Sequence, residues 1–346
     1  MSRTKAILIT ILMLLLAAPA SASAALNPLV DLVSLDSVMR WINAYRANPD
    51  PAGVPAAVKA LSRFGSFKDP EQSGVFVGFI AGVIATNPEK AEHLVNKMLP
   101  LPPGDQWIVV RAIAYSGHPD WRNMLRRFDT KLPARKVLIE KYLTGQMPRL
   151  YQYQQEPAVS TWDSMKSKVT GKELPKAHIL EPSPELLDTY WGYYFATGHA
   201  RPISRIIEML AWSLEVDSVD KLTLGSMAKY TLASNASRDP ELLVALREAR
   251  ERTPKDTAKV LAQVIDAADT VETAKLRKEA MAAIEELRRK GPAYRRNVSW
   301  WGQIGQGALA VGCIAAAATG QVYLGLPCVI TGGVSSAALS TWEKQQ

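Results

Sequence analysis

The sequence predicts an all-α fold, built as an irregular α-solenoid or as stacked helix pairs and ending in an apolar helical hairpin. Three observations support this prediction. Between residues 51 and 291, apolar residues recur at helical spacing in segments of roughly 10 to 20 residues. Pro, Gly, Asn and Asp separate these segments. The apolar–polar alternation typical of strands is rare, whereas Ala and Leu are abundant.

The first 24 residues have the organisation of a secretory signal peptide. Arg3 and Lys5 form a short basic start, residues 6–18 are uncharged and rich in Leu and Ile, and residues 22–24 (Ala-Ser-Ala) offer a small-residue cleavage site. The apolar run is shorter than the roughly 20 residues that a membrane-spanning helix needs. We therefore expect cleavage and an exported, periplasmic protein, with an uncleaved anchor as the alternative.

The charge of the chain is modest. The formal net charge is +8, and it becomes +6 once the two cations of the signal peptide are removed. No block of Lys and Arg has the length typical of nucleic-acid binding, so we expect no nucleic acid as a partner. The excess positive charge instead favours solubility and some attraction to anionic lipid or polymer.

Residues 25–150 form an N-terminal helical, repeat-like region. Apolar periodicity and turn residues predict five helices there, over residues 54–64, 75–85, 89–99, 106–115 and 120–128. The second of these is apolar on nearly all sides, which predicts a buried helix. Tight turns between short helices favour antiparallel pairs.

A polar connector, residues 151–183, follows. It is interrupted by proline and has no sustained apolar periodicity, so it is either a linker or a functional loop. Its aromatic residues Tyr151, Tyr153 and Trp162 could contact a ligand or pack on the helices.

Residues 184–291 form a C-terminal helical region, with helices expected at 184–195, 203–214, 222–232, 241–250, 254–268 and 271–290. The first contains the densest aromatic stretch of the chain. Helical spacing places most of its rings in the core, and those left over, Tyr193 among them, could line a groove. The candidate groove aromatics are Tyr190, Trp191, Tyr193 and Tyr194.

A short internal repeat links the two helical regions. Residues 85–99 align without a gap on residues 196–210, since each copy starts with Ala-Thr and closes with Met-Leu. Looser copies occur at 115–119 and 233–235. The pattern resembles the helix-turn-helix units of HEAT-like and tetratricopeptide-like repeat proteins, which implies a scaffold that binds proteins or peptides. The repeat spacing is uneven, so an irregular helical bundle is the alternative.

Residues 292–346 are predicted to form an apolar, Gly/Ala-rich helical hairpin. Residues 298–341 carry no charge and divide at a turn near residue 320 into two segments of about 20 residues, the length of a membrane span. Small residues recur at every fourth position, which favours close helix packing and a homo-oligomer formed through the hairpin. These small residues are Ala308, Gly312, Ala316, Gly320, Gly332, Ser336 and Ser340.

Charged and aromatic residues flank both ends of the hairpin, as at a membrane interface; they are Arg295, Arg296, Trp300, Trp301 and Trp342. We therefore expect the hairpin to contact membrane lipid. The two arginines would stay on the outer side of the membrane, against the positive-inside tendency. A soluble apolar layer, or insertion only after export, is the alternative.

The chain has two cysteines, Cys313 and Cys328, on either side of the expected hairpin turn. In an oxidising periplasm they could form a disulfide, and otherwise they are two small apolar thiols in close packing. Neither has the spacing of a metal ligand, and we expect no metal and no cofactor.

No sequence motif for catalysis is present. The histidines are isolated, and His118 and His199 follow glycines in similar turns, which favours a structural role. Asp188 and Glu208 could act as an acid–base pair, but an exposed surface or an ion pair with Arg201 or Arg205 is the ordinary explanation for carboxylates on helices. We name no catalytic residue.

Three functions remain open. The sequence favours an exported, membrane-associated scaffold that binds an envelope protein or peptide. The alternatives are an envelope hydrolase or lipid-handling enzyme, and a protein whose hairpin perturbs a membrane.

Overall fold

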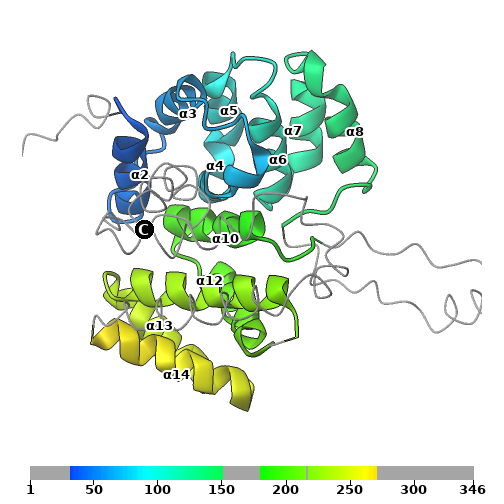
Figure 1. Ribbon diagram of the computed structural model, residues 1–346. Helices are drawn as coiled ribbons and strands as arrows, with labels where there is room; N and C mark the ends of the chain where they lie inside the picture. The colour runs from blue at the N-terminus through cyan, green and yellow to red at the C-terminus, as the bar shows by residue number, and fades with distance from the viewer. Residues whose placement is uncertain (1–31, 151–179, 216, 271–346) are drawn as a thin grey trace, which may run out of the picture.

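The computed structural model describes residues 32–150, 180–215 and 217–270, and these residues form helices and turns without strands (Figure 1). The all-α prediction is therefore confirmed for this part of the chain. The expected signal peptide, the helix at 271–290, the hairpin with Cys313 and Cys328, its small-residue rows and its interface residues lie outside the described residues. So does the polar connector, apart from residues 180–183.

The N-terminal region contains seven α-helices in the part described. They are α2 (Leu35–Ala44), α3 (Val54–Arg63), α4 (Gly74–Thr86), α5 (Ala91–Met98), α6 (Trp107–Tyr115), α7 (Trp121–Phe128) and α8 (Lys136–Leu143). Three single 3₁₀ turns, η2 (Pro70–Gln72), η3 (Pro88–Lys90) and η4 (Pro133–Arg135), precede α4, α5 and α8. The five expected helices are confirmed within a few residues. The sequence reading did not anticipate α2 and α8.

The described C-terminal region contains α10 (Pro184–Thr197), α11 (Ala200–Met209), η6 (Leu210–Leu214), α12 (Val219–Ala236), α13 (Pro240–Arg250) and α14 (Lys255–Asp269). Two expectations were wrong in detail. Residues 203–214 are not one α-helix, because the chain tightens to 3₁₀ geometry at Leu210. Residues 233–235, read as a turn, lie inside α12, where the side chain of Asn235 donates to the carbonyl of Thr231.

Helix α10 lies between the two halves of the structure, with α2–α8 on one side and α12–α14 on the other (Figure 1). It packs most extensively on α4, and α4 also packs on α6. Burial on several sides explains why residues 74–84 are all buried, as the apolar sequence of this helix predicts. The described helices include none with the length and hydropathy needed to cross a membrane.

Glycines make the contact between α4 and α10 possible. Gly74, Gly78 and Gly82 occur at every fourth position of α4 and so share one face. A Cβ atom on Gly78 would lie 1.9 Å from the carbonyl oxygen of Thr189, and one on Gly192 would lie 2.0 Å from that of Val75. The two backbones are therefore in direct contact.

The two helices run in the same direction. Gly74 faces Glu185, Gly78 faces Thr189, and Gly82 faces Tyr193 and Ala196, so the contacts advance along both helices together. The internal repeat of the sequence falls on this pair, because its two copies contain the ends of α4 and α10 and the helices that follow them. Thr86 and Thr197 occupy equivalent positions, and each hydroxyl donates to the carbonyl four residues earlier.

Candidate functional site

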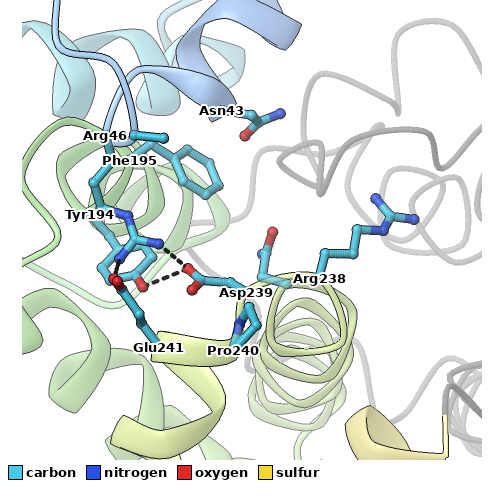
Figure 2. Close-up of a pocket in the computed structure, with 10 residues that line it drawn as sticks. Asn43, Arg46, Tyr194, Phe195, Arg238, Asp239, Pro240 and Glu241 are labelled. Carbon is cyan, nitrogen blue, oxygen red and sulfur yellow. Dashed lines mark hydrogen bonds and ion pairs between the residues drawn. The ribbon is translucent and has the colours of Figure 1, made fainter.

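A pocket of about 570 Å³ opens where α2, α10, α12 and α13 meet (Figure 2). Its lining combines two arginines, two carboxylates, two amides and two aromatic rings. The residues are Asn43, Arg46, Ala47, Tyr194, Phe195, Asn235, Arg238, Asp239, Pro240 and Glu241. Segments far apart in the sequence thus contribute to one concave surface, which is the usual form of a ligand site.

Arg46 connects the two sides of the pocket. It follows α2, and its guanidinium donates to Asp239 at 2.6 Å and to Glu241 at 2.9 Å, at the start of α13 (Figure 2). The side chain of Glu241 is 83% exposed, so solvent screens that ion pair and it contributes little stability. The contact with the more buried Asp239 is the stronger of the two.

Asp239 is held by three different groups. It is the N-cap of α13, where its carboxylate accepts from the backbone N–H of Leu242 at 3.1 Å. The same side chain accepts from the hydroxyl of Tyr194 at 2.8 Å and from Arg46. Burial would raise the pKa of Asp239, but these donors together outweigh it and lower the pKa below its ordinary value.

Tyr194 supports this network from α10. Burial raises the pKa of its hydroxyl, and the adjacent carboxylate of Asp239 adds to the effect, so the hydroxyl remains a hydrogen-bond donor at neutral pH. The guanidinium carbon of Arg46 also lies 5.0 Å from the centre of the Tyr194 ring, which is within cation–π distance.

Gly198 gives Arg46 the space that it needs. This residue ends α10 in the left-handed conformation, with φ of 67°, as helix-terminating glycines commonly do. A Cβ atom there would lie 2.8 Å from Cδ of Arg46. The same glycine therefore terminates the helix and accommodates the arginine side chain.

The chemistry of this lining favours binding. A carboxylate with a lowered pKa has no proton to donate at neutral pH and is a weak base. The ten described residues that line the pocket include no His, Cys, Ser or Thr. The lining also includes the amides of Asn43 and Asn235, the guanidinium of Arg238 and the ring of Phe195, side chains of the kinds that make hydrogen bonds and apolar contacts.

The four candidate groove aromatics from α10 are all buried. Of these, Tyr194 lines the pocket, whereas Tyr193 lies in the core and donates to the carbonyl of Ser116 at 3.2 Å. Burial raises the pKa of Tyr193 to about 12. Trp191 is also in the core and donates to Thr231 at 3.0 Å, and Tyr190 is buried beside it.

A second cluster of ionisable groups lies at the start of α10. Arg111 of α6 donates to Glu185 in a short contact, and its guanidinium carbon lies 4.9 Å from the Trp107 ring. Burial raises the pKa of Glu185, and the opposing effect of Arg111 does not cancel it. Neither residue lines the pocket. We interpret this ion pair as a link between α6 and α10.

The other residues considered for chemistry have structural roles. His118 accepts from the backbone N–H of Asp120 at Nδ1, and its Nε2 lies 3.2 Å from the carbonyl oxygen of Pro88, so it connects two turns. Asp188 is buried in the core, so of its two structural explanations the exposed surface does not apply, whereas Glu208 pairs with Arg205 at 2.6 Å. In the part of the chain that is described, no three His, Cys, Asp or Glu residues are arranged to hold a metal ion.

Sequence reasoning missed most of the pocket. Arg46 follows α2, a helix outside the predicted ones although Ser34 and Ser37 form a capping box at its start. Asp239 was recognised as the residue before a helix, but its contacts with Arg46 and Tyr194 join positions about 190 and 45 residues away, which no local pattern reveals.

Comparisons of the chain with protein-family models, with curated protein sequences and with solved structures gave no match.

Proposed function

We propose that the chain is an exported helical scaffold that binds a protein or peptide partner in the cell envelope. The observation that carries the proposal is the pocket between α2, α10, α12 and α13, whose lining is suited to binding rather than to acid–base chemistry. Arg46, Asp239 and Tyr194 stabilise its walls, and the neighbouring amides and Phe195 are the groups that would contact the partner.

The stacking of helix pairs supports an irregular solenoid. Two helix-turn-helix units, α4 with α5 and α10 with α11, carry the internal repeat, and their first helices pack in parallel. Parallel contact between equivalent helices also occurs between neighbouring units of helical-repeat proteins, which use their concave surfaces to bind partners, although here α6, α7 and α8 separate the two units in the chain. Under this proposal the pocket is part of such a surface.

The proposal also includes export and membrane attachment. Residues 1–24 would direct secretion, and the hairpin of residues 292–346 would hold the helical part at a membrane. Deletion of residues 297–346 should release the protein from sedimented membranes and leave the fold of the remaining helices intact. If the truncated protein still sediments with membranes, the hairpin is not the anchor.

A pocket-filling substitution tests the binding role. Ala47 is exposed and lines the pocket, whereas Ala44 is an exposed alanine of α2 outside the lining, so Ala47→Trp and Ala44→Trp form a matched pair. Affinity capture from native membranes should recover the same partner with the wild type and with Ala44→Trp, and should lose it with Ala47→Trp. Equal recovery with all three proteins would exclude the pocket as the binding surface.

A further inference from the structure

A basic segment on a different part of the molecule has no place in the pocket described above. Residues 116–150 contain eight Lys and Arg against three Asp and Glu, a net charge of +5, which is most of the +8 of the whole chain. The segment comprises α7, α8 and the turns around them. None of the residues that line the pocket belongs to it.

Two arginines in this segment share one aromatic ring. The guanidinium carbon of Arg122 lies 4.6 Å from the Trp121 ring centre, and that of Arg149 lies 5.0 Å from it. The two guanidinium carbons are therefore no more than about 10 Å apart, roughly one Debye length at 0.1 M salt, so their charges repel each other without full screening. Trp121 itself is 3% exposed and packs in the core, which fixes the position of the ring.

Neither arginine has a carboxylate within ion-pair distance among the residues that the structure describes. The acidic residue nearest to Arg122 in sequence is Asp120, and its carboxylate already accepts hydrogen bonds from Arg127 at 2.9 Å and from Asn123. The half-buried position of Arg149 and the charge of Arg122 lower the pKa of Arg149, as expected for a cation whose charge is not compensated.

We propose that Arg122 and Arg149, held on the ring of Trp121, form a binding site for a phosphate group, either as free phosphate or on a lipid headgroup. Arginine presents several N–H donors in a planar fork that matches the oxygens of phosphate. Free phosphate as a dianion compensates both positive charges. The phosphodiester of a lipid headgroup carries one negative charge, as a carboxylate does, and it is matched through its two free oxygens. The other cations of the segment raise the local concentration of such an anion.

The first test measures inorganic phosphate binding to the full-length protein by calorimetry, with sodium chloride and sodium acetate at equal ionic strength as references. Arg122→Gln and Arg149→Gln should each weaken phosphate binding by about tenfold, the usual effect of losing a charge-assisted hydrogen bond. Arg126→Gln is the matched control, because it also removes one exposed arginine from α7. The side chain of Arg126 donates to Asn123 and does not contact Trp121. This control should leave the affinity unchanged.

The second test distinguishes the two sources of phosphate. Vesicles of phosphatidylcholine with and without phosphatidylglycerol are floated with the wild type, the double variant Arg122→Gln/Arg149→Gln and the Arg126→Gln control. A loss of phosphatidylglycerol-dependent flotation in the double variant alone assigns the site to a lipid headgroup. Calorimetric binding that depends on both arginines, without any such loss, assigns it to free phosphate.

The proposal is overturned if the wild type shows no binding of phosphate beyond that of chloride or acetate, or if the control variant loses as much affinity as the double variant. Circular dichroism melting of each variant establishes that it is folded at the temperature of the measurements. The site lies apart from the pocket, so its failure would leave the proposed scaffold function untouched, and the reverse also holds.

Discussion

The contact between α4 and α10 gives the sharpest quantitative prediction. Substituting Gly78 with Ala would place a Cβ atom 1.9 Å from the carbonyl oxygen of Thr189 and 2.8 Å from the backbone nitrogen of Tyr193. Both atoms belong to the backbone of α10, so no side-chain rotation can relieve the clash. The two helices would have to separate by more than 1 Å along the most extensive helix–helix contact of the described structure, by rough estimate.

Two effects of opposite sign determine how much stability Gly78→Ala loses. Overpacking of a dense core costs about 1–3 kcal/mol, sometimes more, whereas Ala is favoured over Gly inside a helix by up to about 1 kcal/mol. Because the obstacle is backbone, we expect the cost to lie at the upper end and the net loss of stability to be about 2 kcal/mol. At an unfolding entropy of about 2.1 cal/mol/K per residue, this loss lowers the melting temperature of a chain of 346 residues by about 3 °C.

Urea unfolding followed by circular dichroism measures this loss. Gly82→Ala should be less damaging, because its nearest obstacle is the Cβ of Ala196 at 2.7 Å. Gly104→Ala is the control, since no atom lies within 4 Å of its added Cβ and its φ is not positive. It should stay within about 0.5 kcal/mol of the wild type. If Gly78→Ala proves as stable as the wild type, or Gly104→Ala as unstable as Gly78→Ala, the packing argument is wrong.

Three further predictions concern ionisable residues and are tested by urea unfolding. Tyr194→Phe removes the donor to Asp239 and should cost about 1 kcal/mol. Asp239→Asn keeps an N-cap acceptor but loses the charge. The pKa of Asp239 is lowered in the folded state. The Asp239→Asn variant should therefore be less stable than the wild type by the full amount near neutral pH, and this difference in the free energy of unfolding should shrink as the pH falls through that lowered pKa. A difference that does not change with pH would contradict this. For Glu185→Gln we expect the opposite pH dependence. Because the pKa of Glu185 is raised in the folded state, the wild type should lose stability relative to the variant as the pH rises through the ordinary range of a carboxyl group.

The close approach of α4 and α10 has a trace in the sequence. Gly74, Gly78 and Gly82 follow the same every-fourth-position pattern as the small residues of the expected hairpin, in a helix whose apolar sequence predicts burial. The pattern shows that one face of the helix is flat. It does not show which helix packs on that face, because any second helix with small residues would fit.

Aromatic residues illustrate a similar limit. Helical spacing placed most rings of α10 in the core, and the structure buries all four candidates. Spacing left Tyr193 as a ring that could line a groove, but it is buried in the core because α10 has helices on both sides (Figure 1). Of the four candidates, Tyr194 lines the pocket, because it lies opposite the start of α13.

The sequence by itself determined most of the segments that become helices, because apolar periodicity, N-caps and terminating glycines act within a few residues of each other. It also determined that α4 would be buried, since an apolar surface on all sides has to be covered. Only the tertiary structure decided that Arg46 meets Asp239 across almost two hundred residues, and that Arg149 returns to the ring of Trp121. Such contacts depend on how entire helices stack, and the free energy of stacking is spread over many apolar contacts rather than encoded in any local pattern.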